Sequence, residues 1–150
     1  MTIFIASDHR GFELKNKIIE YLQEKNIRIE DLGNYQYDPV DDYPIFARKV
    51  VQAVLQNTTE YLGIVICGSG VGVSIVANRF PGIRCAVGFQ KEQVVHTREN
   101  DNVNVLALPS DYINFEETKE LIDAFLQTQT KQEEKYKRRI EELDTMSLTH

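Results

Sequence analysis

The chain has 150 residues, a length that fits one compact domain with its own hydrophobic core. Hydrophobic residues make up 42% of the sequence and charged residues 27%, as in ordinary globular proteins. The formal net charge of −6 argues against a nucleic-acid-coating role, because that role needs a basic surface. We therefore expect no nucleic-acid partner.

The two cysteines, Cys67 and Cys85, both lie in apolar stretches. Two cysteines do not support a disulfide framework, and alone they do not make a zinc site. A reducing, cytoplasmic setting is therefore expected. The N-terminal "MTIFIASDHRG" has no basic segment and a four-residue apolar run, so it predicts neither a signal peptide nor a membrane span.

Apolar runs and segments of helical period alternate along the chain. Short apolar runs predict strands at 2–6, 27–33, 61–67, 84–89 and 103–108. Apolar residues at helical spacing predict helices at 11–26, 41–57, 91–100 and 114–128, with another from the glycine cluster to about Arg79. Five strands that alternate with helices predict an α/β fold, a parallel sheet sandwiched between helices.

The segment "KQEEKYKRRIEEL" (131–143) predicts one more helix, which is polar on every side and therefore not part of the core. A position across a partner subunit and a solvated tail are both open for it. The sequence shows no internal repeat or low-complexity tract, so we expect a single domain over residues 1–150.

Three polar segments are expected beyond the carboxyl ends of the strands, where open parallel sheets bind ligands. "SDHRG" (7–11) follows the first strand, and "CGSGVG" (67–72) follows the third. "RENDN" (98–102) precedes the fifth strand and completes the group.

The glycine cluster "GSGVG" has the spacing G-x-G-x-G. It lacks the Lys-Ser/Thr pair of a P-loop, and its third glycine comes one residue too early for a dinucleotide fingerprint. The pattern predicts a tight turn before a helix, whose backbone N–H groups point the same way and hold an anion or a developing oxyanion. A merely close-packed turn is the alternative.

Cys67 opens this turn, and a thiol near a helix N-terminus favours the thiolate, which can act as base or nucleophile. The alternative is a buried cysteine that acts as a small hydrophobe, which is how we interpret Cys85. Asp8 can hold a sugar hydroxyl or cap the next helix. His9 can donate to a phosphate or move protons.

Four segments together resemble ribose-5-phosphate isomerase type B, a family that includes the galactose-6-phosphate isomerase subunits. They are "SDHRGFELK" (7–15), "DYP" (42–44), "GIVICGSGVGVSIVANRFPGIR" (63–84) and "NVLAL" (104–108). The resemblance covers roughly residues 1–143.

This resemblance implies a three-layer Rossmann-like sandwich with a five-stranded parallel sheet and an extra C-terminal helix. It implies a homodimer or dimer of dimers whose sites use both subunits, with residues from about 130–150 contacting the partner. The implied reaction interconverts ribose 5-phosphate and ribulose 5-phosphate through a cis-enediolate, with a small phosphorylated sugar as substrate. The family uses no metal and no organic cofactor.

The resemblance also assigns roles to single residues. Cys67 is implied as the base, Ser69 as the proton relay to the sugar oxygens, Asp8 as a contact of the sugar ring and His9 as a phosphate contact. The backbone N–H groups that would hold the enediolate belong to the turn, namely Gly68, Gly70, Val71 and Gly72.

Two departures affect the ring-opening and phosphate-binding parts of the site. Where the family has His-Asn ahead of the fifth strand, this chain has Asn100 and Asp101, and His96 lies one helical turn back. Where the family has a phosphate-binding Arg after the fifth strand, this chain has Asp111, and a carboxylate would repel a phosphate.

The C-terminal helix keeps most of the family's phosphate-binding charge. Lys135 replaces one Arg, which keeps the charge but loses the bidentate fork, and Arg139 matches a second. Together with His9 they are the expected phosphate ligands, and Arg10 or Arg138 could compensate for the missing Arg.

Three functions stay open: a working ribose-5-phosphate isomerase, an isomerase of another sugar phosphate or one half of a heteromeric isomerase, and a non-catalytic sugar-phosphate-binding protein. The intact Cys67 and Ser69 count against the third, since a binding protein needs no base. A flavodoxin-like nucleotide binder would use Tyr35 or Tyr37 as a ribose clamp, but its motif match is much weaker.

Overall fold

The computed structural model describes residues 1–146, and the last four residues of the expected 130–150 helix and tail lie outside it. In the described part, five parallel strands form one sheet in the order β2-β1-β3-β5-β4. The strands are β1 (Thr2–Ser7), β2 (Ile29–Asp31), β3 (Tyr61–Cys67), β4 (Cys85–Val87) and β5 (Val105–Pro109). The α/β fold with a five-stranded parallel sheet is confirmed.

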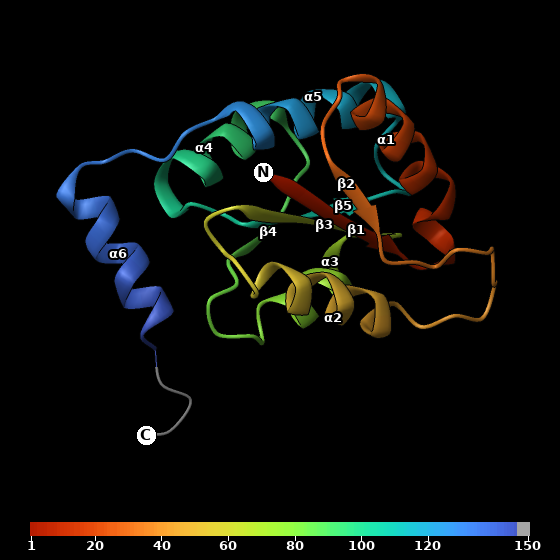
Figure 1. The fold of residues 1–150 in the computed structure, drawn as a ribbon, viewed down its shortest axis with the longest axis horizontal. Coiled ribbons are helices and arrows are strands. Elements are labelled where there is room, and N and C mark those ends of the chain that lie inside the picture. The colour runs from red at the N-terminus through yellow and green to blue at the C-terminus, as the bar shows by residue number, and fades with distance from the viewer. Residues whose placement is uncertain (147–150) are drawn as a thin grey trace.

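Helices cover both faces of this sheet, which gives three layers (Figure 1). One layer holds α1 (Phe12–Glu24), α4 (Lys91–Asp101) and α5 (Phe115–Gln127). The other layer holds α2 (Tyr43–Val54) and α3 (Val71–Ala77). A short 3₁₀ turn, η1 (His9–Gly11), links β1 to α1. Among the described residues, no helix combines the length and apolarity that crossing a bilayer would require.

The central strand β3 is apolar on both faces, as a doubly covered parallel strand must be. Its even-numbered residues, such as Ile64 and Ile66, pack against the layer of α1, α4 and α5. The odd-numbered Val65 and Cys67 pack toward α2 and α3. This two-residue alternation directs the Cys67 side chain to the α2–α3 side of the sheet.

The two edge strands are shorter than the sequence predicts. Apolar patterning predicts strands at 27–33 and 84–89, but β2 and β4 have three residues each. Each of them pairs with a single neighbour, β1 or β5, and that neighbour continues as a strand beyond the paired segment.

The helix α6 (Glu134–Asp144) projects from the body near the start of β4 (Figure 1). None of its residues is buried, which confirms that it lies outside the core. Two ion pairs hold this end of the chain: Arg84 Nη1 lies 2.6 Å from Asp144 Oδ1, and Lys131 Nζ lies 3.2 Å from Glu99 Oε2.

Candidate active site

The carboxyl ends of β1, β3 and β5 meet at one edge of the sheet. Ser7 is in register with Ile66, and the Asp8 N–H donates to the Ile66 carbonyl over 3.3 Å. On the other side of β3, Cys67 is in register with Pro109. Strand register alone therefore brings the Asp8-His9 pair next to Cys67.

The Cys67 thiol lies between an apolar cluster and the glycine turn. The residue is 5% exposed and packs in the cluster that contains Ala6 and Val73. Its carbonyl accepts hydrogen bonds from both the backbone N–H and the hydroxyl of Ser110, each at 3.0 Å. The sulfur is thus buried, as for a core cysteine, but its backbone is fixed at the start of the turn.

The glycine turn carries backbone donors for which residues 1–146 provide no acceptor. Gly70 has φ +73°, in the left-handed region that favours glycine, and α3 starts directly after it. Within residues 1–146, the N–H groups of Gly68, Ser69 and Gly70 have no hydrogen-bond acceptor. The Val71 N–H donates to Ser69 Oγ over 3.2 Å, so Val71 does not offer the free donor that the resemblance implies.

Side chains from two other segments pack tightly against this turn. A Cβ at Gly72 would lie 2.6 Å from Tyr43 Cζ, so the tyrosine ring covers the start of α3. A Cβ at Gly68 would lie 2.7 Å from Asp111 Oδ2 and would also crowd Arg10. Tyr43 belongs to the segment "DYP", to which sequence reasoning gave no role. Its place against Gly72 makes it part of the site.

Asp8 caps η1, in agreement with the capping role that the sequence offered as one of two alternatives. Its Oδ1 accepts from the Arg10 N–H at 3.0 Å and the Gly11 N–H at 3.3 Å, which leaves Oδ2 for a ligand. Burial raises the pKa of Asp8, and the two backbone hydrogen bonds oppose that rise. Capping and ligand contact can therefore use different oxygens of one carboxyl.

His9 follows Asp8 and is hydrogen-bonded to Asp41 of the loop before α2. Donor atoms of Asp8, His9 and Asp41 lie within 4.8 Å of one another, a spacing that a cation could bridge. In the structure, however, His9 Nδ1 and Asp41 Oδ1 lie 2.7 Å apart and use those atoms in a hydrogen bond. Sequence reasoning missed Asp41 because no periodicity or motif connects it to His9.

Asp111 is paired rather than free. Its carboxylate accepts from both Nε and Nη2 of Arg10, which lies 101 residues away in the chain. The pair raises the pKa of the Arg10 guanidinium. The carboxylate at this position therefore has a counter-charge, since Asp111 faces a cation beside Gly68.

Asn100 and Asp101 lie at the opposite edge of the sheet from Cys67, so the expected place of "RENDN" is wrong within one chain. Asp101 ends α4 just before β5, and its carbonyl accepts from Arg84 Nε over 3.0 Å. A segment that precedes a parallel strand lies at its amino end. Asn100 Nδ2 lies 2.8 Å from His96 Nε2, a side-chain pair on α4.

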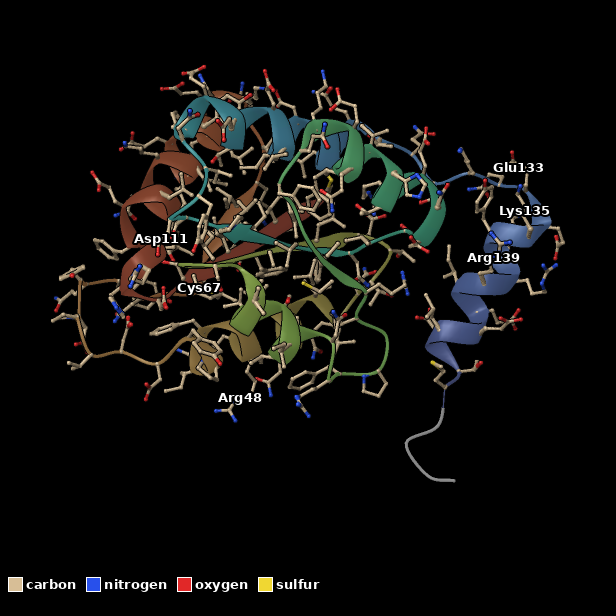
Figure 2. The ribbon with its side chains drawn as sticks, turned by 180° about the vertical axis from the view of Figure 1, so that it is seen from behind. Arg48, Cys67, Asp111, Glu133, Lys135 and Arg139 are labelled. Carbon is tan, nitrogen blue, oxygen red and sulfur yellow. The ribbon has the colours of Figure 1, made fainter. Side chains whose placement is uncertain are left out.

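Lys135 and Arg139 also lie far from Cys67 in the same chain. Figure 2 shows both on α6, at the other end of the molecule from Cys67 and Asp111. Both cations lie near the Tyr136 ring, with Lys135 Nζ 4.9 Å and Arg139 Cζ 6.0 Å from its centroid. One chain therefore does not bring the expected phosphate ligands to its own thiol.

The second thiol, Cys85, is in a different environment. It starts β4 and packs against the apolar cluster under α2 and α3. Burial raises the pKa of Cys85 to about 12, so its thiol stays neutral at ordinary pH. Its surroundings agree with the interpretation of Cys85 as a core residue.

A buried thiol, an Asp-His pair and unused N–H donors at the carboxyl edge of a parallel sheet suit an isomerase that moves a proton between adjacent carbons. The family model described as Ribose/Galactose Isomerase matches residues 3–143, and the chain belongs to this family. The resemblance read from the four sequence segments is thereby confirmed.

Individual relatives agree with this assignment. A protein of Mycoplasma pneumoniae named probable ribose-5-phosphate isomerase B is 42% identical over 127 residues, which are 85% of this chain and 83% of that protein. The crystal structure of a ribose 5-phosphate isomerase from Thermotoga maritima superposes with a TM-score of 0.90 at 42% identity, covering 97% and 98% of the two chains. The crystal structure of ribose-5-phosphate isomerase B from Mycoplasma genitalium with bound ribulose-5-phosphate superposes with a TM-score of 0.92 at 39% identity. The match covers 95% of this chain and 93% of that chain.

Proposed function

We propose that the protein interconverts ribose 5-phosphate and ribulose 5-phosphate, with Cys67 as the base. The observation that supports this most directly is the place of Cys67 at the end of β3, directly before three backbone N–H groups that lack acceptors within residues 1–146. An aldose–ketose isomerase needs this combination, because a proton leaves carbon while negative charge develops on the neighbouring oxygen. The solved relative that holds ribulose-5-phosphate supports the choice of sugar.

The proposed reaction starts with the Cys67 thiolate, which takes the proton from C2 of the open-chain aldose. The C–H electron pair forms the C1–C2 double bond, and the carbonyl pair moves onto O1 to give the cis-enediolate. N–H groups of Gly68, Ser69 and Gly70 stabilise that charge. Ser69 Oγ moves the hydroxyl proton from O2 to O1, and the Cys67 thiol returns its proton to C1, which gives the ketose.

Asp8 and His9 hold the two ends of the sugar in this proposal. Asp8 Oδ2, which its capping bonds leave unused, contacts the sugar hydroxyls. His9 contacts the phosphate from the adjacent position on η1. No metal or organic cofactor enters the proposed steps, and the free thiols of Cys67 and Cys85 fit a cytoplasmic location.

A second copy of the chain completes the proposed site. Lys135 and Arg139 lie on an exposed helix far from Cys67, so they can bind the phosphate only in a neighbouring subunit (Figure 2). Asn100 and Asp101 reach a substrate in the same way, from the amino edge of the partner's sheet. We therefore propose a homodimer or a dimer of dimers.

The test is isomerisation of ribose 5-phosphate by the purified protein, its Cys67→Ala variant and a Cys85→Ala control. Removal of the base should lower kcat by about 10²–10⁴-fold, while Cys85→Ala should keep turnover. Turnover that survives in Cys67→Ala would contradict the role of the base. Absence of turnover in folded wild-type protein would contradict the proposed substrate.

Another sugar phosphate is the second candidate, because Asp111 and Arg10 form an ion pair beside Gly68 and alter the charge next to the turn. A six-carbon substrate such as galactose 6-phosphate should be tested in the same assay, alone and with any co-expressed homologue. A higher kcat/KM for galactose 6-phosphate than for ribose 5-phosphate would mean that the same mechanism acts on the six-carbon sugar. Binding without turnover of any sugar phosphate would favour the non-catalytic alternative.

A further inference from the structure

The loop between β2 and α2 brings Asp41 to the end of β1. Asp41 Oδ1 accepts from the His9 backbone N–H at 2.9 Å and lies 2.7 Å from His9 Nδ1. One carboxylate oxygen thus fixes both the backbone and the ring of His9. The Asp41 side chain is 5% exposed, whereas that of His9 is 25% exposed. A ligand can therefore reach the histidine more easily than the aspartate.

This contact determines how the imidazole can be used. An ionised carboxylate accepts hydrogen bonds and donates none, so Nδ1 must carry the hydrogen in this bond. The other ring nitrogen, Nε2, faces away from Asp41 and donates to a phosphate oxygen when it also carries a hydrogen. The His9 backbone N–H is bound to the same oxygen, so this oxygen is fixed and cannot follow the ring. Rotation of the ring would therefore break its bond to Asp41.

Asp41 is itself held in place from behind. Its second oxygen, Oδ2, accepts from Asn34 Nδ2 over 3.3 Å. The Asn34 carbonyl accepts from Lys15 Nζ at 2.8 Å, and the same ammonium lies 2.8 Å from both carboxylate oxygens of Asp31. The Lys15 side chain is fully buried, so this chain of polar contacts is anchored in the protein interior.

Other charged groups near His9 are more exposed or already paired. Asp8 uses Oδ1 to cap η1, and Arg10 pairs with Asp111. The Tyr37 ring lies in a T-shaped arrangement with the His9 ring, with 6.5 Å between the two ring centroids. Asp41 is therefore the residue that fixes the direction of the imidazole.

We propose that Asp41 is a positioning residue for substrate phosphate, acting through His9 by holding the ring with Nδ1–H toward itself and Nε2 toward the ligand. This inference rests on the proposed function, in which His9 contacts the phosphate. It adds a residue for which sequence reasoning gave no role. In this arrangement the phosphate contacts His9 and not Asp41, so loss of Asp41 should weaken phosphate binding without removing the base.

Kinetics of Asp41→Asn test this role, with Asp42→Asn as the matched control. Asp42 is the next residue, is exposed, and makes no side-chain cap to α2, so its variant removes an equal charge without a contact to His9. We expect Asp41→Asn to raise KM for ribose 5-phosphate and Ki for inorganic phosphate about 10-fold, with kcat within about threefold of wild type. A result equal to that of Asp42→Asn, or a fall in kcat at unchanged KM, would overturn the proposal.

A double-mutant cycle shows whether Asp41 acts through His9. In the His9→Ala background, Asp41→Asn should add less than about a twofold change in KM. A full 10-fold effect in that background would show that Asp41 acts by another route and would overturn the proposal.

The tautomer of His9 gives a readout that needs neither turnover nor a folded variant. Nitrogen-15 NMR of the wild-type protein should show hydrogen on His9 Nδ1, and added inorganic phosphate should bring hydrogen onto Nε2 as well and shift its signal. Hydrogen on Nε2 with a bare Nδ1 would overturn the proposal. Failure of the proposed function would show differently, as wild-type protein that has this tautomer but does not isomerise ribose 5-phosphate.

Discussion

The two edges of the sheet differ in how much of the site each can build within one chain. At the carboxyl edge, register places Asp8, Cys67 and the glycine turn side by side, and buried contacts fix them. At the amino edge, Asp101 lies beside Arg84, which pairs with Asp144 of the exposed α6. In the proposed site, one chain therefore supplies the proton-transfer residues and His9, while its Lys135 and Arg139 face outward on α6.

Subunit mixing gives the strongest test of this division. Arg139→Ala should lower kcat/KM for ribose 5-phosphate by about 10²-fold, because it removes a charged hydrogen bond to phosphate. Mixing it with Cys67→Ala should restore about one quarter of wild-type activity, since half of the dimers would be hybrids with one intact site each. Steady-state assays before and after subunit exchange measure this.

The control for mixing is Lys137→Ala, which removes a cation from the same exposed helix and should leave activity near wild type. Hybrids carrying two different affinity tags would show that subunits had exchanged. Exchange without recovery of activity would mean that each chain builds its whole site. The proposed division of the site between two chains would then be wrong.

The sequence was sufficient for the carboxyl edge because local patterns determine it. Alternating apolar runs fix the strand order in the chain, and residues that follow parallel strands share one edge, so the approach of Asp8 to Cys67 could be predicted. The expected place of Asn100 was wrong because Asn100 precedes its strand and therefore lies at the amino edge. The distance of Lys135 and Arg139 from Cys67 also could not be read from the sequence, because it depends on how α6 leaves the body.

Pairs between distant segments were beyond sequence reasoning for another reason. His9 and Asp41 are 32 residues apart, and Arg10 and Asp111 are 101 apart. No sequence periodicity or motif predicts either pair. Each depends on the path of a loop past a strand end, which backbone packing decides.

The thiol of Cys85, at the amino edge of the sheet, should make stability depend on pH. Burial raises the folded-state pKa of Cys85 to about 12 from a reference value of 9.0, so above pH 9 the unfolded chain releases a proton that the folded chain keeps. This contribution to stability is complete below pH 9 and is lost as pH rises toward 12. At pH 10 the loss is about 1.4 kcal/mol.

Urea unfolding of wild-type protein and Cys85→Ala at pH 8 and pH 10 measures this loss. The variant should be less stable at pH 8, since it leaves a small cavity, but should lose less stability between the two values. Groups common to both proteins cancel in the difference. Equal losses would show that the Cys85 thiol ionises in the folded protein. The interpretation of Cys85 as a buried core cysteine would then be wrong.

The smallest expected effect concerns charge at the carboxyl edge itself. Asp111 neutralises Arg10 beside Gly68, so this edge presents little net positive charge to a phosphate. Asp111→Asn would free the guanidinium and should lower KM for ribose 5-phosphate about fivefold, whereas Arg10→Ala should raise it by a similar factor. Both differences should shrink in concentrated salt, because the pair is partly exposed. If Asp111→Asn instead raises KM as Arg10→Ala does, the carboxylate serves to hold Arg10 in place, and the carboxyl edge supplies more of the phosphate site than its separation from α6 implies.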